Sequence, residues 1–111
     1  MEILETKIDN NVLLLAFKGR LDANSSNAAQ DQVLAAIDRG EIRLLADLAR
    51  LEYISSAGLR IFMMAAKRLK PLGGKVVLCS LSEPIKEIFE IAGFVSLFPI
   101  HPERDEAVKS F

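Results

Sequence analysis

Two short apolar runs on either side of a helical segment constrain the fold of this chain most strongly. Residues 42–48 and residues 75–79 each form such a run, and both predict buried strands. The segment between them repeats apolar side chains at the spacing of one helix face: Leu59, Phe62, Met63, Ala66 and Leu69. Pro71 and Gly73-Gly74 end this helix. A strand, a helix and a second strand in succession predict a parallel βαβ unit.

The rest of the chain continues this alternation of strands and helices. We expect strands at 1–8 and 12–19 around a polar turn, helices at 24–39 and from Ser82 to Gly93, a last strand at 94–98 and a short helix from Pro102. The predicted order is β-β-α-β-α-β-α-β-α. An initial hairpin followed by parallel units predicts an α/β fold of α+β character, with a mixed sheet of about four to five strands.

Length, charge and cysteine content bound the class of protein. With 111 residues the chain has room for one domain, which we expect to span residues 1–111. The 14 basic and 15 acidic residues leave a net charge of −1, so a nucleic acid is not an expected partner. One cysteine excludes an internal disulfide. No apolar run approaches the ~20 residues of a spanning helix, so a cytoplasmic protein without membrane insertion is expected.

The residue types that catalysis and metal binding need are sparse. His101 is the single histidine, and Cys79 lies in an apolar run where a thiol is usually buried and inert. One histidine and one cysteine far apart do not make a metal site, and Cys79 lacks a nearby base. Gly73-Gly74 lacks the spacing of a phosphate-binding loop. We therefore expect no catalytic residue, no metal, no cofactor and no enzymatic activity.

Ser55 and Ser56 stand directly before the second predicted helix. We expect Ser56 at or beside the N-cap, where free backbone N–H groups and the positive end of the helix dipole favour an anion. Ala57 and Gly58 are small enough for a bulky partner to approach the backbone. The residues alone leave two roles open for Ser56, an ordinary cap worth about 1 kcal/mol and a site of regulatory modification.

Several short motifs occur along the chain in a fixed order. They are Gly19-Arg20-Leu21-Asp22, Asp47-Leu48, the turn from Tyr53 to Leu59, Gly73-Gly74, and Ala92-Gly93-Phe94 followed by Phe98. In this order and spacing they resemble the STAS domain family, in particular its stand-alone anti-sigma factor antagonists. The resemblance covers nearly the whole chain and implies a single STAS domain.

The resemblance implies that Ser56 is a phosphorylation site. In the family, the serine after the turn's Asp is phosphorylated by the partner, an anti-sigma factor that is also a kinase of the GHKL type. The family's Asp is Ser55 here, which makes Ser55 an alternate acceptor, and the following Ser is Ala57. The implied mechanism is partner switching: the unmodified protein binds the anti-sigma factor and frees the sigma factor, and the phosphorylated protein is released. A PP2C-type phosphatase is a further implied partner.

The expected partner surface surrounds this turn. Arg60, Ile61 and Met64 lie opposite the predicted core face of the helix, together with Lys67 and Arg68, and form a candidate docking strip. The predicted partner-binding residues are Asp22, Ser55, Ser56, Ala57, Gly58, Arg60, Ile61 and Met64. The absence of the family's Asp at position 55 leaves a second role open, a STAS subunit of a membrane lipid-transport ATPase complex that phosphorylation does not regulate.

Overall fold

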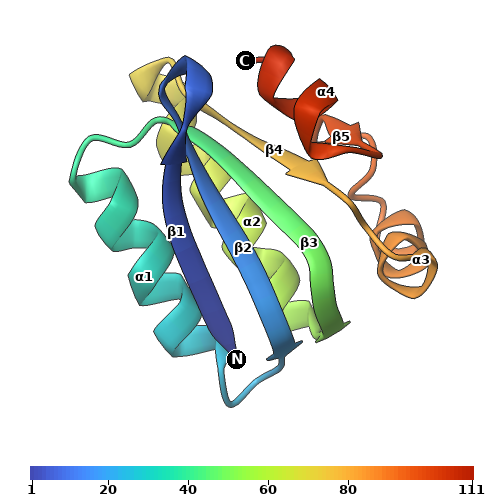
Figure 1. Cartoon of the computed structure of the whole chain (residues 1–111). Coiled ribbons are helices and arrows are strands. Elements are labelled where there is room, and N and C mark those ends of the chain that lie inside the picture. Colours follow the sequence, from blue (N-terminus) through green and yellow to red (C-terminus); the bar gives the residue numbers. More distant parts are fainter.

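A computed structural model describes the chain from residue 1 to residue 111 (Figure 1). Its elements follow in the order β1 (Glu2–Ile8), β2 (Val12–Leu21), α1 (Ser26–Asp38), β3 (Arg43–Ile54), α2 (Ser56–Leu69), β4 (Lys75–Cys79), α3 (Glu83–Ile91), β5 (Ile100–His101) and α4 (Arg104–Lys109). Short 3-10 turns lie at Asp9–Asn11 and Lys70–Leu72. The predicted order of strands and helices is confirmed.

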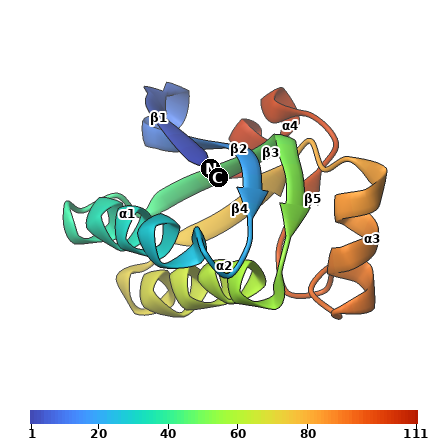
Figure 2. The ribbon, with the colours of Figure 1, turned by 90° about the horizontal axis from the view of Figure 1, so that it is seen from below.

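The strands form one five-stranded sheet in the order β1-β2-β3-β4-β5. β1 pairs with β2 in antiparallel orientation, and every later pair is parallel. Each helical connection therefore steps to the next strand in the same direction, and right-handed crossovers place the three connecting helices on one face of the sheet. Figure 2 shows α1, α2 and α3 on that face and α4 on the other.

The main core lies between the sheet and the three connecting helices. It contains 24 buried residues, among them Phe17, Phe62 and Phe89. The ring of Phe62 packs against the other two rings at centroid distances of 5.3 and 6.0 Å. On the second face a cluster of 6 buried residues joins the strands to α4, which contributes Ala107. Because α4 has only 6 residues, it covers one part of this face and leaves the rest open (Figure 1).

The last strand lies outside the predicted segment. Residues 95–97 form a turn, no residue from 94 to 98 is in a strand, and the pair Ile100–His101 forms β5 beside the end of β4. The phenylalanines of the predicted strand pack inward instead, since the Phe94 and Phe98 ring centroids are 6.0 Å apart and Phe98 is buried. Apolar content alone does not distinguish a turn whose side chains enter the core from a short strand. The prediction of a strand at 94–98 is therefore wrong.

β3 continues beyond the predicted run of residues 42–48. It stays paired with β2 up to Ile54, which lies opposite Leu21. The pairing is irregular at two places along β2, and such bulges interrupt the alternation of side chains that marks a strand in a sequence. The continuation brings residue 55 to the end of the sheet, directly beside the end of β2.

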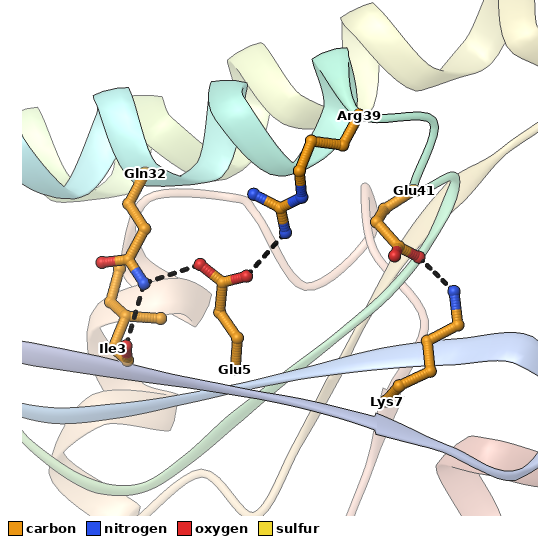
Figure 3. Close-up of polar contacts among 6 residues, drawn as sticks. All are labelled: Ile3, Glu5, Lys7, Gln32, Arg39 and Glu41. Atoms are coloured by element: carbon orange, nitrogen blue, oxygen red, sulfur yellow. Dashed lines mark hydrogen bonds and ion pairs between the residues drawn. The ribbon is translucent and has the colours of Figure 1, made fainter.

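Polar side chains fasten the edge strand β1 to α1 and the loop after it. Figure 3 shows the residues involved: Ile3, Glu5, Lys7, Gln32, Arg39 and Glu41. Gln32 donates to the backbone oxygen of Ile3 and to the Glu5 carboxylate, each at 2.9 Å, and Arg39 pairs with Glu5 at 2.7 Å. Lys7 pairs with Glu41 at 2.5 Å. These contacts hold an edge strand that buries few side chains of its own.

We expect Glu5→Gln to lower the stability modestly at neutral pH and not in acid. The hydrogen bond from Gln32 and the charge of Arg39 hold the pKa of Glu5 below its ordinary value of 4.5. A carboxylate whose pKa is lower in the folded state stabilises the fold at any pH above its unfolded-state pKa. This contribution is lost as the pH falls through the folded-state pKa. Because Arg39 is about half exposed, the loss at neutral pH should stay below about 1 kcal/mol.

Urea unfolding of both proteins at pH ~7 and pH ~3 measures this effect. The two free energies of unfolding should differ at the higher pH and converge at the lower one. An undiminished difference in acid would show that the Glu5 charge is not its source.

Candidate functional site

The candidate site lies where the parallel strands β2 and β3 end side by side. The backbone N–H of Ser55 donates to the carbonyl of Leu21 at 2.9 Å, which ties the start of α2 to the segment that leads into α1. Leu21 and Ile54, the last residues of the two strands, are both buried. The carboxyl ends of parallel strands are the edge at which α/β sheets commonly bind their ligands.

Ser55 caps α2. Its backbone is extended (φ −91°, ψ 173°), and its Oγ accepts a hydrogen bond from the N–H of Gly58 at 3.2 Å. Its carbonyl accepts the first helical bond, from Leu59, at 3.0 Å. Ser56 is the first residue of the helix, so the prediction that it lies at or beside the N-cap is confirmed. The capping role belongs to Ser55, and a cap of this kind contributes about 1 kcal/mol.

Ser56 presents its side chain to solvent. The residue is exposed, whereas Ser55 is half-buried. Of the two hydroxyls, only that of Ser55 takes part in a hydrogen bond within the protein. The Ser56 hydroxyl stands at the N-terminus of a helix of 14 residues, where unpaired N–H groups and the helix dipole favour negative charge.

Gly58 lets α2 approach the strands closely. A Cβ at this position would lie 2.8 Å from Cγ of Leu21 and 2.8 Å from Cγ1 of Ile54. Gly58 is buried, so it does not offer the exposed backbone that the sequence suggested. Its effect on the surface is indirect, because the close packing that it permits fixes where the first turn of α2 and Ser56 stand.

Asp22 organises the turn between β2 and α1. Its carboxylate accepts hydrogen bonds from the backbone N–H groups of Asn24 and Ser25, both at 3.0 Å, and from the Ser25 hydroxyl at 3.2 Å. These bonds, the one from the Ser25 backbone first among them, hold the pKa of Asp22 below its ordinary value. Asp22 therefore carries a fixed negative charge one residue beyond Leu21, beside the start of α2.

Arg20 and Tyr53 form a pair that the sequence did not reveal. They lie opposite each other in the parallel register of β2 and β3, and the guanidinium carbon of Arg20 is 4.5 Å from the centroid of the Tyr53 ring. Tyr53 remains 37% exposed. The residues are far apart in the chain, and only the register of two parallel strands brings them together. The pair places a cation and an aromatic ring two residues before Asp22 and Ser55 respectively.

The exposed face of α2 differs in part from the predicted docking strip. Arg60 is exposed, and Ala57 and Met64 are half-buried. Ile61 is 1% exposed and belongs to the main core, so the prediction that it lies on the docking strip is wrong. The reason is that α2 packs against both α1 and the sheet, which buries a wider arc of the helix than a single apolar stripe predicts.

The residues considered for catalysis or metal binding lie apart from this site. Cys79 is fully buried in β4, and burial raises the pKa of its thiol, which agrees with the predicted inert role. His101 lies in β5. No three side chains of the types that bind metals gather into a group. None of the helices combines the length and apolarity needed to traverse a bilayer.

Comparison with known proteins agrees with the resemblance seen in the sequence. The profile of the STAS domain family matches residues 4–107. BtrV of Bordetella bronchiseptica, provisionally named an anti-sigma factor antagonist, is 39% identical over 111 residues, which cover 100% of this chain and 95% of BtrV. The anti-sigma F factor antagonist of Paenibacillus polymyxa is 24% identical over 106 residues, which cover 95% of this chain and 91% of that protein.

Solved structures share the fold at lower identity. A Thermotoga maritima protein, provisionally assigned as an anti-sigma factor antagonist, has a TM-score of 0.91 at 18% identity, with 97% of this chain and 92% of that chain covered. The anti-sigma factor antagonist SpoIIAA in its unphosphorylated form has a TM-score of 0.84 at 15% identity, with 98% and 95% covered. SpoIIAA of Bacillus in its phosphorylated form has a TM-score of 0.76 at 16% identity, with 98% of each chain covered.

The family profile covers most of the chain, and the match to BtrV covers all 111 residues of the chain. The expected fold and the expected absence of enzymatic activity both follow from this kinship. The chain belongs to the STAS domain family, among its anti-sigma factor antagonists.

Proposed function

We propose that this protein binds an anti-sigma factor through the surface around the start of α2, and that phosphorylation of Ser56 releases it. The observation that carries the proposal is that the two neighbouring serines have different roles. Ser55 caps the helix with its hydroxyl, whereas Ser56 is exposed and its hydroxyl is free. The cap and the acceptor are thus separate groups, and modifying one leaves the other in place.

The chemistry is a phosphoryl transfer from ATP to the Ser56 hydroxyl. The Oγ of Ser56 forms a bond to the γ-phosphorus, the bond to the β-phosphate oxygen breaks, ADP leaves, and the hydroxyl proton is released. The kinase is the partner itself, an anti-sigma factor of the GHKL type, and a PP2C-type phosphatase removes the phosphate. Ser55 is the alternate acceptor, but its Oγ is held by Gly58 and is less accessible.

Electrostatics lets the fold tolerate the modification while the interface does not. A phosphate adds a charge of about −1.5 to −2. At the first residue of α2 this charge meets the positive end of the helix dipole, and Arg60 lies one turn later on the same side of the helix. A partner surface fitted to a neutral hydroxyl would have to desolvate the phosphate, which costs several kcal/mol.

The proposed partner surface combines the two segments that Leu21 and Ser55 tie together. It contains Asp22 from the first segment and Ser55, Ser56, Ala57 and Arg60 from the second, with Met64 at its margin. Gly58 acts through the position of the helix. The relatives are themselves named as anti-sigma factor antagonists, which supports an anti-sigma factor as the partner, and such a role would be carried out in the cytoplasm.

Identification of the partner tests this function. Affinity purification of the unmodified protein from its host should return a GHKL-type kinase. The alternative role, a fixed STAS subunit of a lipid-transport complex, predicts a transporter ATPase instead. Recovery of that ATPase without a kinase would reject the switch.

Substitution of the cap separates the roles of the two serines. Ser55→Ala should lower the free energy of unfolding by about 1 kcal/mol, because Gly58 N–H loses its acceptor. The same variant should still be phosphorylated by the partner, since Ser56 remains. Thermal unfolding and phosphate incorporation measure the two effects. If a folded Ser55→Ala protein incorporated no phosphate, the phosphate acceptor would be Ser55 and not Ser56.

A further inference from the structure

The second face of the sheet is only partly covered. Figure 1 looks onto this face, with α2 behind the strands and α4 at its upper right. Beneath α4 the strands bury apolar side chains. Beside the first residue of α4, Arg104, lies the cross-strand row Leu4, Ala16 and Asp47, and the row Glu2, Lys18 and Arg50 follows farther along the strands. Leu4 is 53% exposed, so apolar surface of the sheet here meets water.

A cavity of about 300 Å³ lies over these rows. Its lining brings together residues of three strands and of α4: Leu4, Ala16, Phe17, Lys18, Asp47, Ala49, Arg50 and Arg104. Leu4, Ala16 and Ala49 supply an apolar floor, and Lys18 and Arg50 stand on the side that leads toward the end of the strands.

The charge of this cavity is positive. Asp47 is its only carboxylate, and Arg104 neutralises that group at 2.6 Å while the Ala49 N–H donates to the other oxygen at 3.0 Å. Lys18 and Arg50 form no ion pair, and Glu2, which faces Lys18 across the strands, forms none either. Two unpaired cations beside an apolar floor suit a ligand with acidic and apolar groups side by side.

The cavity and the candidate site lie along the same two strands, β2 and β3. Arg50 precedes Ser55 by five residues of extended chain, a distance of roughly 17 Å at about 3.3 Å per residue. Arg20 lies two residues beyond Lys18 on β2, and its partner Tyr53 lies between Arg50 and Ser55 along the chain. A single protein partner can therefore cover both regions.

We infer that the open face of β1, β2 and β3 is a second docking surface, which takes an extended acidic and apolar segment of the partner protein. Apolar side chains of that segment rest on Leu4 and Ala16, and its carboxylates face Lys18 and Arg50. The identity of the partner rests on the proposed function, whereas the chemistry of the segment rests on this cavity alone.

An NMR titration tests the inference without the partner. The probe is the blocked peptide acetyl-Leu-Glu-Leu-Asp-amide, added to the ¹⁵N-labelled full chain, and the matched control is acetyl-Leu-Gln-Leu-Asn-amide. The acidic peptide should shift the amide signals of Leu4, Ala16, Lys18 and Arg50. The control peptide should bind at least about tenfold more weakly, because it lacks the charge.

Variants of the chain test the assigned contacts. Lys18→Gln with Arg50→Gln should weaken the acidic peptide about tenfold, and Glu2→Gln should tighten it, because a competing carboxylate is removed. Lys86→Gln, on α3 at the other face, is the matched control and should change nothing. The dispersion of the amide signals reports whether each variant is folded.

Several outcomes overturn the inference. Absence of shifts at the open face, or equal shifts with the uncharged peptide, would show that no acidic segment binds there. The same shifts with sodium acetate alone would assign the cavity to small carboxylates, and shifts with protein concentration alone would assign it to a second copy of this chain. Ser56→Asp should leave peptide binding unchanged, so failure here and failure of the phosphorylation switch are separate results.

Discussion

Ser56→Asp should abolish binding to the anti-sigma factor and leave the fold intact. The carboxylate adds a charge at the first residue of α2, where the helix dipole is favourable by up to about 1 kcal/mol. The thermal midpoint should therefore stay within a few degrees of the wild type. At the interface the same charge must be desolvated against a surface fitted to a hydroxyl, and we expect a loss of affinity of at least about 100-fold.

Isothermal titration calorimetry with the purified anti-sigma factor measures this loss, and Ser56→Ala is the matched control. Alanine removes the hydroxyl without adding charge, so Ser56→Ala should bind nearly as the wild type does and should resist release by ATP. If Ser56→Asp binds with wild-type affinity, charge at this position does not control the partner.

Gly58→Ala should destabilise the protein although alanine is the better helix former. Helix propensity alone predicts a gain of up to about 1 kcal/mol for this exchange. The added Cβ, however, would meet Leu21 and Ile54 at 2.8 Å, and the contact with Leu21 is made at a branch point that is fully buried. Overpacking of this kind costs about 1–3 kcal/mol, so we expect a net loss of about 1–2 kcal/mol.

Chemical denaturation gives the free energy of unfolding for this comparison. Ser56→Ala, two residues earlier on the exposed side of the same helix, should stay within about 0.5 kcal/mol of the wild type. The Gly58→Ala variant should also bind the partner more weakly, because the first turn of α2 is displaced. A more stable Gly58→Ala protein would show that the strands yield and that the close approach is not required.

The alternation of elements could be predicted because its signals are local. A continuous apolar run at residues 75–79 and the helical spacing from Leu59 to Leu69 each occur within one element, and both are found where the sequence places them. The error at residues 94–98 arose because Phe94 and Phe98 are apolar for a reason that lies in the tertiary packing. No local pattern distinguishes an apolar side chain that enters the core from a turn from one that enters it from a strand.

The position of the candidate site in the chain could be predicted, because its signals are local. Its details could not, because they depend on contacts between elements. Ser55 and Ser56 both suit a helix cap, and only the extended backbone of Ser55 and its bond to Gly58 decide between them. The burial of Ile61 depends on how α2 sits against α1. The Arg20–Tyr53 pair depends on the register between β2 and β3, which is interrupted by bulges. Contacts between elements thus account for the differences.

Release of the protein from its immobilised anti-sigma factor by ATP tests the central claim most directly. Tandem mass spectrometry of the tryptic peptide 51–60, which contains both serines, locates the phosphate in the released and retained fractions. The account predicts that the released protein carries phosphate on Ser56 and that the retained protein does not. Equal phosphorylation of the two fractions, or release of protein without phosphate on Ser56, would contradict it.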